Sequence, residues 1–244
     1  MSMAIYAIGD PHLSFTTGKP MDIFGASWEN HVKRMQENWI KTVKDTDTVI
    51  IPGDISWAMS LVEVIPDLKF LDDLPGEKII SKGNHDYWWG TMGKIDKLIQ
   101  DNGFSSLHFL KNNAIQVDQA VVCAARGWIH PTDQNYTAKD EIIYLREIAR
   151  LKRSLEEGIK LLSDQSPHLI AALHYPPLYA SSGDTEFSEI LETYNVELCI
   201  YGHLHGKGIQ NAFEGVRKGV MYKLVSADYL SFTPFPCTFP PSAL

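Results

Sequence analysis

The sequence has 244 residues, of which 44% are hydrophobic and 21% charged, and these are the proportions of a folded globular chain rather than a disordered one. With a formal net charge of -8 and no cluster of Lys and Arg, long nucleic acids are unexpected partners. The chain starts without the features of a secretory signal and contains no stretch of about 18 apolar residues, so we expect a soluble, cytoplasmic protein without membrane contact.

Short runs rich in β-branched residues recur along the chain and end in polar or glycine-containing loops. They predict strands at residues 4–8, 48–51, 78–81, 169–173 and 197–201. Residues 114–117 and 120–124 predict a hairpin, and residues 219–225 predict a late strand. Because strands alternate with helical patterns and a hairpin is present, we expect mixed rather than purely parallel sheets.

Three segments between these strands have the apolar spacing of an amphipathic helix. The first has Ser27 as a plausible N-cap, and its apolar residues are Trp28, Val32, Met35, Trp39, Ile40 and Val43. The second should end at Gly103, and its apolar residues are Met92, Ile95, Leu98 and Ile99. The third, at residues 138–162, predicts a surface helix.

One domain is expected over residues 1–232, followed by a proline-rich tail at 233–244. The tail holds four prolines, so it cannot supply a central strand or helix and is either an extended arm or a loose end. Three cysteines, Cys123, Cys199 and Cys237, show no CxxC spacing. We interpret them as buried small hydrophobes rather than as a disulfide framework or a zinc-thiolate site.

Five short polar motifs stand directly after predicted strands, where ligand-binding loops gather in α/β sheets. They are Asp10-Pro11-His12, Gly53-Asp54, Gly83-Asn84-His85-Asp86, His174 in Leu173-His174-Tyr175-Pro176, and Gly202-His203-Leu204-His205. Residues i and i+2 of an extended segment point to the same side, so Asp10 can pair with His12, and His203 with His205. Carboxylates together with imidazoles suit divalent Zn, Mn or Fe.

Each motif alone has an ordinary explanation. Asp-x-His occurs by chance in surface loops, Gly-Asp marks simple turns, and His174 by itself is more often a hydrogen-bonded core histidine than a ligand. The complete set, with all five motifs at strand ends, argues for a site.

In order and residue type, the motifs resemble those of the calcineurin-like metallophosphoesterase superfamily, whose pattern is D-x-H, G-D, G-N-H-[DE], H and G-H-x-H. The resemblance spans residues 10–205. It implies an α/β fold that is a four-layer α-β-β-α sandwich, with two mixed sheets flanked by helices and a metal site at the carboxyl ends of the strands. Residues 1–232 would then be a metallophosphoesterase domain.

The same resemblance implies a site for two divalent metal ions, Mn, Fe or Zn. Three residues would hold one ion, namely Asp10, His12 and His205, and three would hold the other, namely Asn84, His174 and His203. Asp54 would bridge both ions. His85 would donate a proton to the departing oxygen, and Asp86 would either support His85 or have a purely structural role.

The activity implied is hydrolysis of a small-molecule phosphate ester by in-line attack of a metal-bound hydroxide, with a phosphodiester slightly favoured over a phosphomonoester. Protein serine/threonine phosphatases have an arginine-containing segment after Gly-Asp and read G-N-H-E. Here the chain reads Ile55-Ser56-Trp57 after Asp54, and Asp86 takes the place of Glu, which disfavours that class. Two alternatives stay open, a nuclease acting on short or single-stranded nucleic acid and a non-catalytic metal-binding scaffold.

Three further features near the motifs have open interpretations. Packing is favoured over stacking on a substrate for each of the nearby aromatic residues, which are Trp57, Tyr87, Trp88, Trp89, Trp128 and Tyr179. Arg126 could clamp a phosphate oxygen or form an ordinary ion pair. The segment 13–26 is a candidate lid over the metals.

Overall fold

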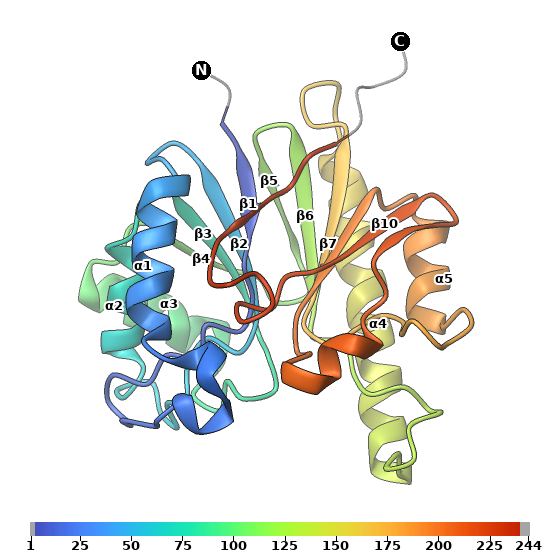
Figure 1. Ribbon diagram of the computed structural model, residues 1–244. Helices are drawn as coiled ribbons and strands as arrows, with labels where there is room; N and C mark the ends of the chain where they lie inside the picture. Colours follow the sequence, from blue (N-terminus) through green and yellow to red (C-terminus); the bar gives the residue numbers. More distant parts are fainter. Residues whose placement is uncertain (1–2, 240–244) are drawn as a thin grey trace.

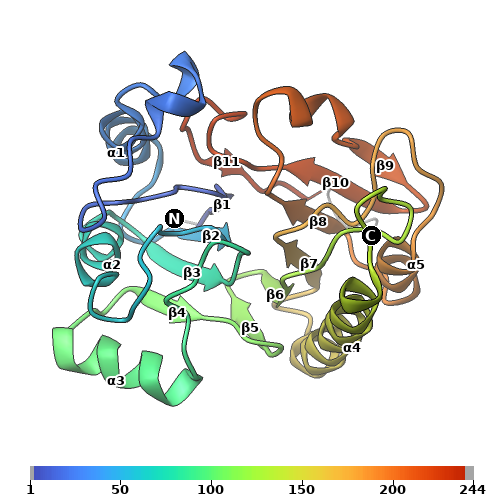
Figure 2. The ribbon, with the colours of Figure 1, turned by 90° about the horizontal axis from the view of Figure 1, so that it is seen from below.

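Two β-sheets lie face to face, and helices cover the outer face of each one (Figure 1). The computed structural model describes residues 3–239. Figure 2 looks along both sheets and shows the helices on either side of them. The predicted α-β-β-α sandwich with two mixed sheets is therefore confirmed.

The first sheet has the strand order β11-β1-β2-β3-β4. Four of its strands are parallel, and they are β1 (Ile5–Ala7), β2 (Thr48–Pro52), β3 (Glu77–Ser81) and β4 (Leu107–Phe109). The fifth, β11 (Phe235–Pro236), runs antiparallel along the edge beside β1. Parallel strands are covered on both faces, which explains why β2 reads as an unbroken buried run.

The second sheet has the order β5-β6-β7-β8-β10-β9. Its parallel centre consists of β6 (Ala120–Ala125), β7 (His168–Leu173), β8 (Leu198–Tyr201) and β10 (Val220–Leu224). The antiparallel edge strands are β5 (Ala114–Val117) and β9 (Gly215–Arg217). All the strands predicted from the sequence are present, with ends that agree to within one residue.

Helices α1 (His31–Thr42), α2 (Ile65–Asp72) and α3 (Met92–Asn102) lie on the first sheet, and α4 (Ala138–Leu161) and α5 (Glu186–Thr193) on the second (Figure 1). Within residues 3–239 there are also three 3-10 helices, at Asp22–Phe24, Ala26–Trp28 and Gly206–Asn211. Gly103 ends α3 in the left-handed conformation, as predicted. Helices α2 and α5 were not predicted because eight residues give too few turns for a clear apolar period.

The predicted start of the first helix is wrong. Ser27 is not its N-cap but lies inside the 3-10 helix Ala26–Trp28. The chain then turns at Asn30, whose φ of 52° is left-handed, and α1 begins at His31. Asparagine tolerates this conformation better than most residues and so separates the two helices. Ile40, which was placed on the buried face, is 59% exposed.

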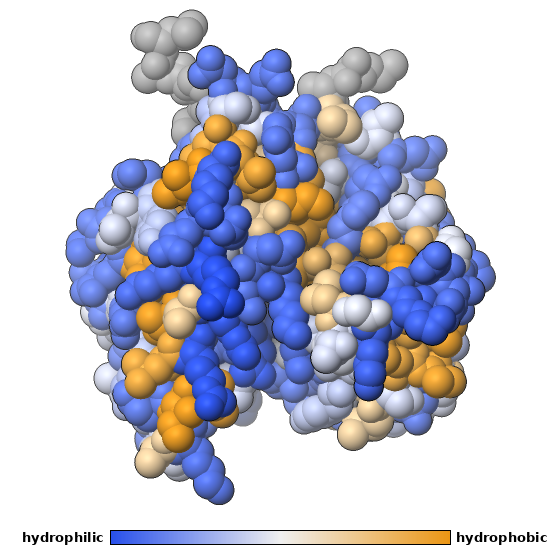
Figure 3. Space-filling view, turned by 180° about the vertical axis from the view of Figure 1, so that it is seen from behind, coloured by the Kyte–Doolittle hydropathy of each residue, from blue (hydrophilic) through white to orange (hydrophobic). Residues whose placement is uncertain are grey.

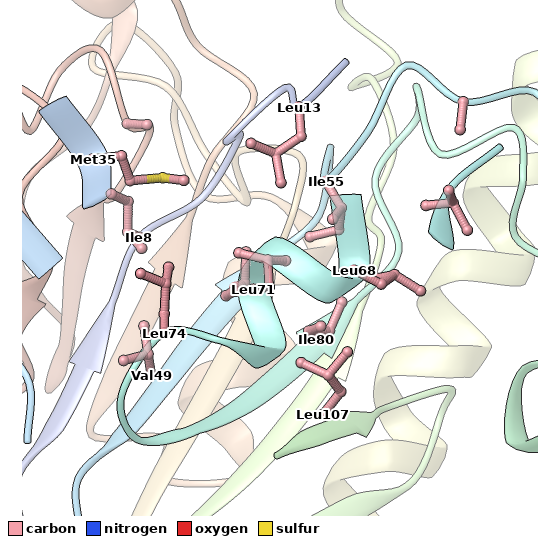
Figure 4. Close-up of a cluster of buried hydrophobic side chains, with 14 of the residues drawn as sticks. Ile8, Leu13, Met35, Val49, Ile55, Leu68, Leu71, Leu74, Ile80 and Leu107 are labelled. Carbon is pink, nitrogen blue, oxygen red and sulfur yellow. The ribbon is translucent and has the colours of Figure 1, made fainter. Parts of the chain in front are cut away.

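Large aliphatic side chains form the core between the first sheet and its helices. Figure 4 shows Leu68 and Leu71 of α2 near Val49 and Ile80 of the sheet. A second apolar cluster lies between α4, α5 and the other sheet, and a third fills the space between the two sheets. Seen from behind, the surface is mainly hydrophilic, with its apolar side chains in several separate groups (Figure 3).

The tail lies along the edge of the first sheet as far as the structure describes it. The Cys237 N–H donates to the Ile5 carbonyl at 2.8 Å, and Cys237 is buried. Residues 240–244 of the predicted tail lie outside the described range. Cys123 and Cys199 are also buried, so the interpretation of the cysteines as small hydrophobes is confirmed. Among residues 3–239, no helix has both the length and the apolar character needed to cross a bilayer.

Candidate metal centre

The sequence motifs meet at one end of the sandwich. Asp10 follows β1, Asp54 follows β2 and Asn84 follows β3, while His174 directly follows β7 and His203 follows β8. The parallel strands of both sheets end on the side seen in Figure 2, so these loops come together there although they span most of the sequence.

One group of candidate ligands contains Asp10, His12 and His205, whose ligand atoms all lie within 4.8 Å of one another. The His205 Nε2 atom lies 3.7 Å from Asp10 Oδ1. Asp10 and His12 are buried, so two of the three side chains are shielded from solvent. These are the residues that the family resemblance assigns to one ion.

The second group gathers around the Nε2 atom of His174. This atom lies 2.7 Å from Asn84 Oδ1 and 3.2 Å from His203 Nδ1. On the other side of the ring, His174 Nδ1 lies 3.1 Å from the Pro52 carbonyl oxygen, which can accept its proton. That hydrogen bond leaves Nε2 free to bind a metal.

Asp54 lies between the two groups. Its Oδ2 atom is 3.7 Å from His12 Nε2 in the first group and 3.5 Å from His174 Nε2 in the second. Its Oδ1 atom accepts a hydrogen bond of 2.7 Å from the backbone N–H of His85. The Oδ2 atom of Asp54 therefore faces both groups, and its Oδ1 atom is held by the backbone N–H of His85.

Four of the candidate ligands have a left-handed backbone. The φ angles are 56° at Asp10, 46° at His12, 51° at Asp54 and 72° at His203. Such conformations are uncommon for residues other than glycine and persist where the surrounding structure enforces them, often at functional sites. Here they turn the side chains of the strand ends toward one another.

Two motif glycines make room for the carboxylates. A Cβ atom at Gly83 would collide with the side chain and the backbone nitrogen of Asp54. A Cβ atom at Gly202 would collide with the side chain of Asp10. The glycines of the third and fifth motifs are therefore required by the close approach of first-sheet acids.

Asp86 organises the loops. Its buried carboxylate accepts backbone hydrogen bonds from Asp54 at 3.0 Å, Ile55 at 2.9 Å and Gly83 at 2.8 Å. Burial, followed by the charge of Asp54, raises the pKa of Asp86 to about 7. No hydrogen bond joins it to the ring of His85 in the described part of the chain. Asp86 thus holds the second and third motifs together through the backbone.

The buried acids and imidazoles of the site strongly shift one another's pKa values. Burial, and then the charge of Asp10, raises the pKa of Asp54 to about 8. Burial opposes protonation of His205, but Asp10 and Asp228 outweigh it and raise the His205 pKa to about 10. Burial and the neighbouring His174 lower the pKa of His203 to about 3. A bound cation would relieve the repulsion between the two buried carboxylates.

The donor set fits divalent cations. It combines carboxylate and amide oxygens with imidazole nitrogens and contains no thiolate, as expected for Mn, Fe or Zn. The buried His205 Nε2 atom has no hydrogen-bond partner among residues 3–239, although it points toward Asp10. An imidazole nitrogen left free in a group of acids is suited to bind a metal.

Asp228 was not predicted from the sequence as a residue of the site. Its Oδ1 atom lies 2.8 Å from His205 Nδ1, and its Oδ2 atom accepts from the Gly206 N–H at 3.2 Å. A carboxylate in this position orients a ligand histidine and increases its basicity. Asp228 lies 23 positions beyond His205 and belongs to none of the five motifs, so no local pattern could have identified it.

A cavity of about 260 Å³ opens beside the ligands. Its walls are His12, Met21, Phe24, Trp28, Trp57, His85, His205 and Gly206. The segment 13–26, predicted as a possible lid, contributes Met21 and Phe24, and its Lys19 Nζ atom lies 3.0 Å from the centroid of a Trp57 ring. The Trp57 ring stacks on His12 with centroids 4.9 Å apart.

Other residues noted in the sequence do not line this cavity. Trp88 and Trp89 are buried and pack against Phe109, as packing residues would. Arg126 forms an ion pair of 3.1 Å with Glu147. The ordinary ion pair expected as one alternative for Arg126 is therefore present.

Comparison with known proteins bears on the family and the fold of the chain. The sequence model described as calcineurin-like phosphoesterase matches residues 3–207. A solved protein of unknown function from Aquifex aeolicus is 16% identical, with a TM-score of 0.50 and 96% of each chain covered. A protein from Thermus thermophilus is 15% identical, with a TM-score of 0.44, covering 84% of this chain and 83% of that one.

At these identities the first structure supports the fold alone, and no curated protein matches the sequence. The family model, in contrast, covers most of the chain and includes every candidate ligand from Asp10 to His205. The chain therefore belongs to the calcineurin-like phosphoesterase family, whose members are metal-dependent hydrolases of phosphate esters.

Proposed function

We propose that this protein binds two divalent cations and hydrolyses a phosphodiester in a small molecule. The position of Asp54 is the observation that carries the proposal. Its Oδ2 atom lies 3.5 to 3.7 Å from an imidazole nitrogen of each ligand group, so one carboxylate can serve two ions. Asp10, His12 and His205 would hold one ion, while Asn84, His174 and His203 would hold the other.

Two such ions, when bound, would act as Lewis acids on the phosphoryl oxygens and would make a water molecule more acidic. The protein then needs no side-chain nucleophile. Its own residues would hold the two ions, with Asp54 shared by the two ligand groups, and the burial of Asp10, His12, Asp54 and His174 shields this side of the site from water. We propose Mn, Fe or Zn as the native metals, because each accepts this mixture of oxygen and nitrogen ligands.

His85 is suited to transfer a proton to the leaving oxygen. Its ring lines the cavity, and its backbone N–H is fixed by Asp54 at 2.7 Å. Burial, followed by His174 and Lys19, lowers the pKa of His85 to about 4 in the protein without ligands. A phosphate ester in the cavity is negatively charged and would raise that pKa toward the range needed for an acid.

The cavity favours a diester over a monoester. Its walls are mainly apolar or aromatic, including Met21, Phe24 and Trp57, and Lys19, which lies over the Trp57 ring, adds one positive charge beside them. A phosphodiester has a single negative charge and a second organic group, which these walls would accommodate. A monoester carries close to two charges at neutral pH and has no second group to place there.

The test is hydrolysis of bis-p-nitrophenyl phosphate and p-nitrophenyl phosphate by chelator-treated protein restored with Mn, Zn, Fe or Mg. We expect metal-dependent turnover of both esters, with a higher kcat/KM for the diester. A higher value for the monoester would contradict the diester proposal while leaving the reaction class in place. Absence of turnover with two ions bound per chain would contradict catalysis itself.

A further inference from the structure

A second cavity, of about 190 Å³, lies where the two sheets adjoin beside α4. The ends of β3 and β6, the link between β4 and β5, and α4 itself all contribute to its walls. None of the seven candidate metal ligands lines this cavity. It is therefore a separate feature of the molecule, and the activity proposed above does not use it.

The walls of this cavity are strongly cationic. Four cationic side chains line it, namely Lys82, Lys111, Arg126 and Arg150, against the single carboxylate of Glu147. Burial, and then repulsion from neighbours that include Arg126 and Lys111, lowers the pKa of Lys82. A concentration of positive charge like this contrasts with a net charge of -8 for the whole chain. The cavity therefore favours an anion.

Several polar atoms of the walls have no hydrogen-bond partner within residues 3–239. They are Ser81 Oγ, Trp89 Nε1, Arg126 Nε and Glu147 Oε2. Ser81, Trp89 and Glu147 are all more than nine-tenths buried. Buried polar groups in folded proteins are almost always paired, with protein, ordered water or a ligand, so these four atoms, all on residues that line the cavity, are candidate partners for its occupant.

The unpaired atoms also define the hydrogen-bonding pattern of the ligand. Ser81, Trp89 and Arg126 can each donate a hydrogen bond, so a ligand that pairs with them offers several acceptor oxygens. Glu147 differs, because Arg126 and Arg150 both bind its Oε1 atom and its Oε2 atom is left as an acceptor. A ligand that also pairs with Glu147 Oε2 therefore carries one proton to donate.

We propose that this cavity binds inorganic phosphate in a protonated form. Its unprotonated oxygens would accept from the cationic and N–H groups, and its P–OH group would donate to Glu147 Oε2. Inorganic phosphate keeps at least one proton at neutral pH, whereas sulfate keeps none. An oxyanion without a proton would leave Glu147 unpaired and repelled, so the site discriminates against sulfate.

The experiment is isothermal titration calorimetry of the metal-loaded protein at pH 7 with inorganic phosphate and with sulfate. Phosphate can also bind at the candidate metal centre, so Asp54→Asn is titrated alongside the wild type. We expect one phosphate site that is still present in Asp54→Asn. Sulfate should bind to this site at least tenfold more weakly than phosphate does. Lys82→Met, which keeps the length of the side chain but removes its charge, should weaken that site at least tenfold.

Lys152→Met is the matched control, because Lys152 is an exposed lysine of α4 that does not line the cavity. It should bind phosphate as the wild type does. Glu147→Gln should reduce the ratio of phosphate affinity to sulfate affinity. If this variant folds poorly, the affinities of wild-type protein for the two anions still test the proposal. Equal binding by Lys82→Met and wild type, or sulfate bound as tightly as phosphate, would overturn the proposal.

Discussion

The two sheets contribute different chemistry to the candidate metal centre. Every carboxylate or amide oxygen in the proposed ligand set comes from the first sheet, on Asp10, Asp54 and Asn84, together with the imidazole of His12. The second sheet supplies imidazoles alone, on His174, His203 and His205. All of the negative charge of the ligand set therefore lies on one half of the sandwich.

The two halves also differ in how they are fixed. Asp86 binds the backbone of the Asp54 and Gly83 loops, so the first half is held by its own hydrogen bonds. The second half is fixed in part by the first, because the His203 N–H donates to Asp10 Oδ2 at 3.0 Å, and in part by Asp228, which holds His205. The acids of the first half thus have two tasks, which are to hold metal and to position the imidazoles.

Asp54→Asn should have the largest effect, because it changes the carboxylate of the first sheet that lies between the two ligand groups. Loss of the charge between the two ligand groups should reduce metal content and lower kcat/KM on the order of 1,000-fold or more. Metal analysis and hydrolysis of bis-p-nitrophenyl phosphate measure the two effects. Asp96→Asn, at an exposed position on α3, should change neither quantity. Two ions retained per chain in Asp54→Asn would count against a bridging position.

His85→Ala separates proton transfer from metal binding. Both ions should remain, while turnover of a diester with an alkyl leaving group should fall about 100-fold or more. The loss should be smaller with p-nitrophenyl esters, because p-nitrophenolate departs without needing a proton. His108→Ala, on the exposed side of β4, is the control. An equal loss with both leaving groups would contradict the role of His85 as an acid.

Asp228→Asn tests the second half alone. The amide can no longer hold His205 Nδ1–H as a carboxylate does, so metal affinity should fall about 10-fold to 100-fold. Competition with a chromophoric chelator measures this change. The effect should be smaller than that of Asp54→Asn, because Asp228 acts through a single imidazole. A loss as large as that of Asp54→Asn would contradict an action of Asp228 through His205 alone.

Much of this arrangement could be predicted from the sequence, because the strand ends and the motifs coincide. Buried β-branched runs fix the strands, and the residues after them must lie at one edge of a parallel sheet. Asp228 could not be predicted in the same way, since its contact with His205 depends on the path of the chain after β10. The cationic cavity was equally hidden, because Lys82, Arg126 and Arg150 meet only through the packing of α4 against β6.

The start of α1 illustrates a different limit. The apolar spacing of Trp28 continues into the helix, but the spacing cannot reveal that Asn30 adopts a left-handed conformation. Trp28 is buried as expected while belonging to another element. An apolar period therefore predicts burial better than it predicts the residue at which a helix begins.

The pH dependence of metal binding separates the contributions of the two sheets. The pKa of Asp54 is raised to about 8, so at neutral pH the metal-free protein holds a proton that an incoming ion must displace. Affinity should therefore rise with pH between about 6 and 8, by up to about tenfold per unit for each displaced proton. His205, with its pKa raised to about 10, contributes in the same direction from the second sheet.

Chelator competition at three pH values measures how steeply the metal affinity changes with pH. In Asp54→Asn the slope should fall by one proton while the His205 contribution remains, and an affinity that does not change with pH would mean that neither group is protonated before the metal binds.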